Sequence, residues 1–253
     1  MPEVFYRGKS TYNDAEIIAL MTGDDTPSRN RKVGPSAQVH FLLSNVSPVE
    51  AQQDGSDEAV CGKCALRPIR NKRCPVCKTQ AGSMKKKCSE CGAILQSCYV
   101  KTWRGTLRAW NNSKNKKKIS PAKAAQKLNP WSVRAVRLGA FGNPSSIPPQ
   151  VLNPFVSEVL NRKLSILSYE HAWLQERHRW TLAFSMASCE SIAQAIMAWD
   201  RGFRTFRTLS PGEQPASMEV MCPRHVNGTL CIECKLCCGN LQPGPSVCIP
   251  THL

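Results

Sequence analysis

The sequence lacks any long hydrophobic run. No stretch of its 253 residues approaches the roughly 18 uninterrupted apolar residues of a membrane-spanning helix. Its first residues, MPEVFYRGKSTYNDAE, also lack the basic-then-apolar order of a secretory signal. These two absences argue against membrane and secreted proteins. We therefore expect a soluble cytoplasmic protein with no membrane partner, long enough to bury a core of its own.

Acidic residues are nearly missing from one segment of the chain. Between Lys63 and Lys118 there are sixteen Lys or Arg residues and one acid, Glu90, so the segment carries +15 of the formal charge of +16. Such a surface attracts nucleic acid or another polyanion, with an acidic phage or host protein as the alternative partner. The positions expected to contact nucleic acid are Lys85, Lys86, Lys87, Arg104, Arg108, Lys116, Lys117 and Lys118.

Aromatic residues interrupt the basic segment after Lys101. Trp103 and Trp110 could stack on bases while the neighbouring cations hold phosphates. Their spacing with Leu107 also fits an amphipathic helix that packs all three side chains inward. The second interpretation is favoured, and it leaves the opposite face of the helix free for a polyanion.

Cysteine is abundant, with fourteen residues. In a reducing compartment closely spaced thiols hold metal more often than they form disulfides. Five pairs have the CxxC spacing, which lets two thiolates on one tight turn reach a single ion. The sequence therefore predicts a metalloprotein.

The strongest local pattern is Cys74-Pro-Val-Cys77 followed after ten residues by Cys88-Ser-Glu-Cys91. Two such knuckles are typical of a zinc ribbon, in which four thiolates complete a closed tetrahedral site. We expect structural zinc here, with no position open to a substrate.

Three further thiols, Cys61, Cys64 and Cys98, flank the ribbon. Three cysteines can hold a [4Fe–4S] cluster and leave one iron free for a small ligand. The alternative is a second zinc site completed by His40, His225 or another cysteine. The sequence leaves these two alternatives open.

A second group of cysteines lies near the C-terminus. The most economical four-ligand set is Cys222, Cys231, Cys234 and Cys237, with Cys238 and Cys248 as spares. Spacing alone does not separate zinc from an iron–sulfur cluster here. Cys189 stands apart, and we interpret it as a buried small residue.

The order of predicted elements indicates an α/β fold. Residues 1–36 are mostly polar, and Thr22–Pro35 is predicted to be a loop. Repeated β-then-α units follow. They indicate a parallel sheet or a partial (β/α) barrel, in which sites form at the C-terminal ends of the strands. Strands are predicted at Gln38–Leu43, Val133–Phe141, Leu164–Tyr169, Leu182–Ala187 and Phe203–Leu209, and helices at Pro148–Lys163 and Glu190–Asp200. The predicted segments are 1–60 with the first strand, 61–98 with the ribbon at 72–97, a basic linker at 99–130, the barrel body at 131–215 and a cysteine-rich extension at 216–253.

An ordered series of motifs resembles a phage and mobile-element family often called gene product 88. The motifs are TGDDTPSRNRKVGP, Cys61-xx-Cys64 with Cys98-Tyr99-Val100, VRLGAFGNP, SYEHAW, MASCES, FRTFR, PASMEV and CIECKLCCG. The resemblance spans about Thr22 to Gly239. Such proteins are similar in outline to radical S-adenosylmethionine enzymes, with a βα barrel, a cluster loop after the first strand and a cysteine-rich C-terminal extension.

The resemblance implies roles for particular residues. It makes Cys61, Cys64 and Cys98 the counterparts of the cluster loop. It places Gly139, Gly142 and Asn143 on the strand beside S-adenosylmethionine, with Asn143 where an acid is expected. A zinc-only protein that binds nucleic acid or a protein partner is the alternative to an iron–sulfur enzyme.

Overall fold

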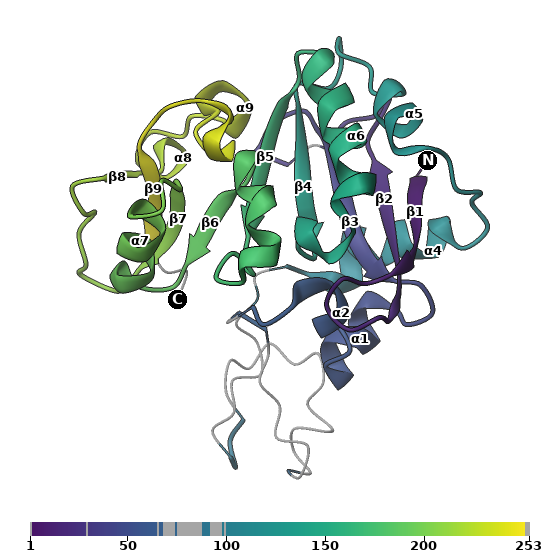
Figure 1. Ribbon diagram of the computed structural model, residues 1–253, viewed down its shortest axis with the longest axis horizontal. Helices are drawn as coiled ribbons and strands as arrows, with labels where there is room; N and C mark the ends of the chain where they lie inside the picture. The colour runs from purple at the N-terminus through teal and green to yellow at the C-terminus, as the bar shows by residue number, and fades with distance from the viewer. Residues whose placement is uncertain are drawn as a thin grey trace.

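The central feature of the computed structural model is one nine-stranded sheet with strand order β1-β2-β3-β4-β5-β6-β7-β9-β8 (Figure 1). The structure describes residues 2–28, 30–64, 66–67, 74, 88–91, 98 and 100–250. β1 and β8 are the two edges of the sheet, and closure into a barrel is not seen within these ranges. The expected barrel is thus confirmed only as a mixed α/β fold with a mostly parallel sheet.

The first part of the sheet is antiparallel. β1 (Glu3–Lys9) pairs with β2 (Glu16–Thr22), and β2 pairs with β3 (Ser36–Leu43). The five central residues of β2, IIALM, are all buried, so both faces of this strand are covered. The sequence analysis described residues 1–36 as mostly polar and predicted no strand there, because it passed over this short apolar run.

From β3 onward the neighbouring strands are parallel. They are β4 (Ala135–Phe141), β5 (Ser165–Glu170), β6 (Met186–Cys189), β7 (Thr205–Leu209), β9 (Ser246–Pro250) and β8 (Glu219–Met221). The strand predicted at Leu182–Ala187 is placed too early, because residues up to Ala183 form the 3-10 helix η3 (Glu176–Ala183). Parallel strands end at one common edge, which gathers the loops that follow β3, β4, β5 and β6.

Helices connect these strands and cover the sheet (Figure 1). α6 (Pro149–Asn161) buries Leu152, Phe155 and Val159, and the Phe155 ring stacks on Phe5 with 4.7 Å between ring centroids. α7 (Ile192–Trp199) lies between β6 and β7, so both predicted helices are present. The remaining elements are α1 (Pro48–Asp54), α2 (Glu58–Cys61), η1 (Thr102–Thr106), α4 (Leu107–Ser113), α5 (Pro121–Gln126), η2 (Pro144–Ser146), α8 (Pro223–Val226), α9 (Cys231–Cys234) and η4 (Gly239–Leu241).

The C-terminal cysteine segment is wedged into the sheet between β5 and β6. These strands pair only through Tyr169 and Glu170, and beside that short pairing the carbonyl of Cys237 accepts the N–H of Ser168 at 3.1 Å. A Cβ at Gly239 would lie 2.4 Å from the Ser185 nitrogen, so the close approach requires glycine. The segment is therefore part of the fold and not a free tail.

Candidate metal centres

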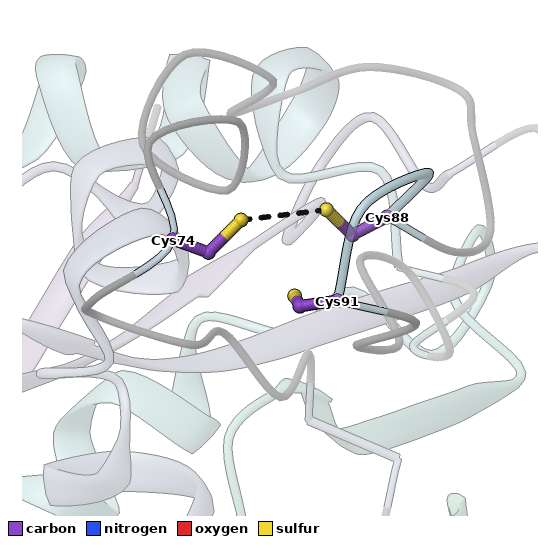
Figure 2. Close-up of side chains that lie close together, drawn as sticks. All are labelled: Cys74, Cys88 and Cys91. Atoms are coloured by element: carbon purple, nitrogen blue, oxygen red, sulfur yellow. Dashed lines mark hydrogen bonds between the residues drawn. The ribbon is translucent and has the colours of Figure 1, made fainter.

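Three cysteines of the expected ribbon are arranged as ligands of one ion. The sulfurs of Cys74, Cys88 and Cys91 all lie within 4.8 Å of one another, and those of Cys74 and Cys88 are 3.8 Å apart (Figure 2). Zinc binds thiolate sulfur at about 2.3 Å, so two ligands of a tetrahedral zinc lie about 3.8 Å apart. Cys77 lies outside the described residues. The trio supports a metal site, and its identification as a zinc ribbon stays a prediction.

In the other two cysteine sets the sulfur atoms lie farther apart. In the part of the chain that the structure describes, Cys74, Cys88 and Cys91 form the one group of three potential ligands whose atoms all lie within 4.8 Å. Cys61, Cys64 and Cys98 do not meet this limit, and neither do any three of the C-terminal cysteines.

Cys61, Cys64 and Cys98 nevertheless lie near one another at the carboxyl edge of the sheet. Burial raises the pKa of Cys64 to about 12, and the charge of Cys98 adds to the shift. Burial also raises the pKa of Cys61 well above its ordinary value, with Asp57, Cys98 and Cys64 adding to it. The three groups are thus close enough to disfavour one another as free thiolates, and bound metal would relieve that cost.

An arginine holds the loop that carries the first two thiols. The Nε and Nη2 atoms of Arg67 donate to Asp57 Oδ1 at 3.0 and 2.6 Å. The same guanidinium donates to the carbonyls of Gly55 and Gly62, at 2.6 and 3.2 Å. Because Gly62 follows Cys61 directly, these bonds fix the turn between the thiols. Sequence analysis gave Arg67 no role, since a side chain that folds back on its own loop has no spacing signature.

The end of β4 packs directly against this loop. Asn143 donates its backbone N–H to the carbonyl of Val60 at 2.7 Å and its side-chain amide to that of Cys61 at 2.9 Å. A Cβ at Gly142 would lie 2.8 Å from the Cβ of Phe41. Gly139 and Gly142 both have φ values above +70°. These three predicted cofactor residues therefore adjoin the thiol loop, and their contact with adenosylmethionine stays a prediction.

A buried polar cluster lies beside the loop. The Tyr12 hydroxyl and Ser145 Oγ are 2.6 Å apart, and Glu170 accepts the backbone N–H of Ser145 at 3.1 Å. Burial raises the pKa of Glu170 to about 7. His178 packs edge-on against Tyr12, with 5.0 Å between ring centroids. Glu170 could be found from the sequence because it follows a predicted parallel strand. Tyr12 could not, because it lies in a turn near the N-terminus and no sequence pattern connects that turn with the carboxyl edge of the sheet.

The C-terminal set Cys222, Cys231, Cys234 and Cys237 lines a single cavity. The spare cysteines face other groups: Cys238 lies 3.8 Å from an Arg204 nitrogen, and Cys248 donates to the Val220 carbonyl at 3.4 Å. Cys189 is buried, and burial raises its pKa to about 12, which suits a packing residue and not a nucleophile.

The predicted nucleic-acid contacts that the structure describes are exposed or partly exposed. Arg104, Arg108, Lys117 and Lys118 are exposed and Lys116 is partly so. Lys85, Lys86 and Lys87 lie outside the described residues.

Of the aromatic residues in this segment, Trp110 is buried and donates Nε1–H to the Leu43 carbonyl at 2.8 Å. Trp103 is 42% exposed. The expectation that both indoles pack inward is therefore wrong for Trp103, because the backbone leaves helical geometry at Arg104.

No helix in the described ranges is long and apolar enough to cross a bilayer. Comparison with protein-family models, with curated proteins and with solved structures found no match.

Proposed function

We propose that this chain is an iron–sulfur protein whose Cys61, Cys64 and Cys98 hold a [4Fe–4S] cluster with one iron open to a small ligand. The observation that carries the proposal is the gathering of these three partly buried cysteines where the parallel strands end. Their sulfurs are not all within the reach of a single ion. A cluster places each thiolate on a different iron and so tolerates a wider spacing.

The residues around the thiols suit such a group. Arg67 and Asp57 fix the loop, and Asn143 ties it to the end of β4. Partial burial of the three cysteines limits the access of solvent, which controls the properties of a bound metal group. A bound cluster would supply one-electron chemistry, and the resemblance to radical S-adenosylmethionine enzymes implies adenosylmethionine as the ligand of the open iron. In that reading the strand end that carries Gly139 and Gly142 would lie beside the ligand.

Iron and sulfide analysis of anaerobically purified protein tests the proposal. The variant C61A/C64A/C98A is expected to lose about four irons and four sulfides relative to the wild type. The matched control is C189A, which removes a buried cysteine of β6 and should lose none. A colourless protein with zinc at this site, or iron that survives the triple substitution, would refute it.

A specific observation favours a second function, which is nucleic-acid binding by the basic segment. Arg104, Arg108, Lys117 and Lys118 are exposed on a segment with sixteen bases and one acid. Affinity for DNA or RNA should fall steeply with salt, and R104Q/R108Q/K117Q/K118Q should flatten the slope of log K against log salt by up to about 4. R177Q/R201Q removes exposed charge outside the segment and serves as control. Salt-insensitive binding, or displacement by an acidic protein but not by nucleic acid, would favour a protein partner instead.

A further inference from the structure

The C-terminal cysteines combine two separate stretches of chain around one enclosed space. Cys231, Cys234 and Cys237 follow one another at intervals of three residues, and Cys222 precedes a proline. A C-x2-C-x2-C run with a further cysteine followed by proline is the ligand pattern of four-iron ferredoxin sites. The pattern is therefore more specific than an isolated CxxC pair.

Backbone geometry turns all four thiols toward the same place. Cys231 and Cys234 lie at the two ends of the single turn of α9. Lys235 then adopts a left-handed conformation, with φ of +55°, and the chain reverses so that Cys237 is buried on the sheet. Cys222 comes from the end of β8, where its N–H binds the Cys248 carbonyl at 2.9 Å. The four residues line one pocket.

The spacing of the sulfurs does not suit a single zinc ion. Two thiolates on one zinc can lie at most about 4.6 Å apart, because each Zn–S bond is about 2.3 Å. No three of these four cysteines have all their sulfurs within 4.8 Å, although the same structure brings Cys74, Cys88 and Cys91 within that limit. This spacing points to a group larger than one ion.

The surroundings suit a buried anionic cluster. Leu167, Leu236 and Val247 line the cavity together with the thiols. The backbone of Leu236 hydrogen-bonds Cys234, and the side chain of Tyr169 hydrogen-bonds Cys237. Hydrogen bonds to sulfur and exclusion of solvent are the features that set a cluster's potential.

Positive charge faces the same thiols. Arg137 and Arg224 lie close enough to Cys231 for their charges to act on its thiol. Arg204 acts in the same way on Cys234. Four thiolates around a metal group leave a net negative site, which these arginines would stabilise.

We infer that Cys222, Cys231, Cys234 and Cys237 hold a second [4Fe–4S] cluster, in which every iron has a protein ligand. Such a cluster has no open position, so it serves electron transfer or folding and binds no substrate. It shares no ligand with the Cys61, Cys64 and Cys98 site, so the two assignments can fail separately.

The test uses the full-length protein, prepared anaerobically, in the background C61A/C64A/C98A. About four irons and four sulfides should remain, and the reduced protein should give an electron paramagnetic resonance signal that added S-adenosylmethionine does not change. Adding C231A/C234A should remove this iron and leave the zinc content unchanged. C238A is the matched control, since Cys238 is buried next to a ligand but faces Arg204, and it should keep the iron.

Three results would overturn the inference. The first is a protein that contains about one zinc fewer after C231A/C234A. The second is iron that depends on Cys238 or Cys248 instead of the four named residues. The third is a signal that shifts with S-adenosylmethionine, which would mean an open iron. If C231A/C234A fails to fold, the C61A/C64A/C98A protein labelled with iron-57 provides the test by Mössbauer spectroscopy. The absence of signals from a sulfur-coordinated four-iron cluster would refute the inference.

Discussion

Arg207 provides the sharpest test of how the C-terminal segment is held. This residue of β7 has 1% of its side chain exposed, and it donates to both carboxylate oxygens of the buried Glu219, at 2.8 and 2.6 Å. Replacing Arg207 by methionine should destabilise the protein by about 3–5 kcal/mol, because it leaves a buried carboxylate without its partner. For a chain of this size we expect the melting temperature to fall by roughly 6–20 °C. Thermal unfolding of the anaerobic protein measures this.

A double variant separates the ion pair from simple loss of packing. R207M/E219L replaces both partners by apolar groups and should recover much of the stability, since no buried charge is left without a partner; Glu213, which also pairs with Arg207, is partly exposed. Because β8 leads directly into Cys222, R207M should also lose iron from the C-terminal set before it loses iron from Cys61, Cys64 and Cys98. If R207M melts within about 2 °C of the wild type, or if the double variant is no more stable than R207M, the reasoning is wrong.

Three other predictions concern the carboxyl edge of the sheet. Gly142→Ala places a Cβ 2.8 Å from the Cβ of Phe41 at a φ of +79°. The substitution should therefore lower both the melting temperature and the iron content. Gly212→Ala is the control, because Gly212 has open space around it, and it should leave the iron content unchanged. Burial raises the pKa of Cys64 to about 12, so metal must displace its proton, and competition by a chelator should become more effective as the pH falls from 8 to 6. The pKa of Glu170 lies near 7, above its unfolded value of 4.5, so its ionised form opposes folding. The stability of the wild type relative to E170Q should therefore fall by about 3 kcal/mol as the pH rises from 4.5 past 7. Chemical denaturation of both proteins at the two pH values measures this change, and a constant difference in stability would contradict the prediction.

The sequence predicted the parallel strands β3, β4, β5 and β7 because they are apolar runs separated by helical periodicity, and it missed β8 and β9 in the cysteine-rich extension. Gln38–Leu43 and Val133–Phe141 lie within two residues of β3 and β4 at each end. It missed β1 and β2, since antiparallel pairing depends on a partner strand and each run is short. The strand expected at Leu182 was misplaced for a related reason: its apolar side chains pack inward from a 3-10 helix as well as they would from a strand.

The cysteine sets could be predicted from the spacing of cysteines in the sequence. The different distances between their sulfur atoms could not. CxxC pairs indicate metal in each set, yet only the fold determines how far apart the sulfurs lie. The fixed turn between Cys61 and Cys64 depends on Arg67, and the wedge that holds Cys237 depends on a close approach at Gly239. Contacts of this kind join distant parts of the chain, so no local pattern contains them.

Arg137 connects the two wider cysteine sets. It lies in the middle of β4, and its register partner on β5 is Leu167, which lines the C-terminal cavity. Its positive charge opposes the rise that burial causes in the pKa of Cys98 and of Cys231, so it acts on one thiol of each set. A cation within range of two negatively charged metal groups stabilises both and reduces the repulsion between them. The sheet therefore places one arginine within range of both cysteine sets, and metal groups bound at the two sets would share its charge.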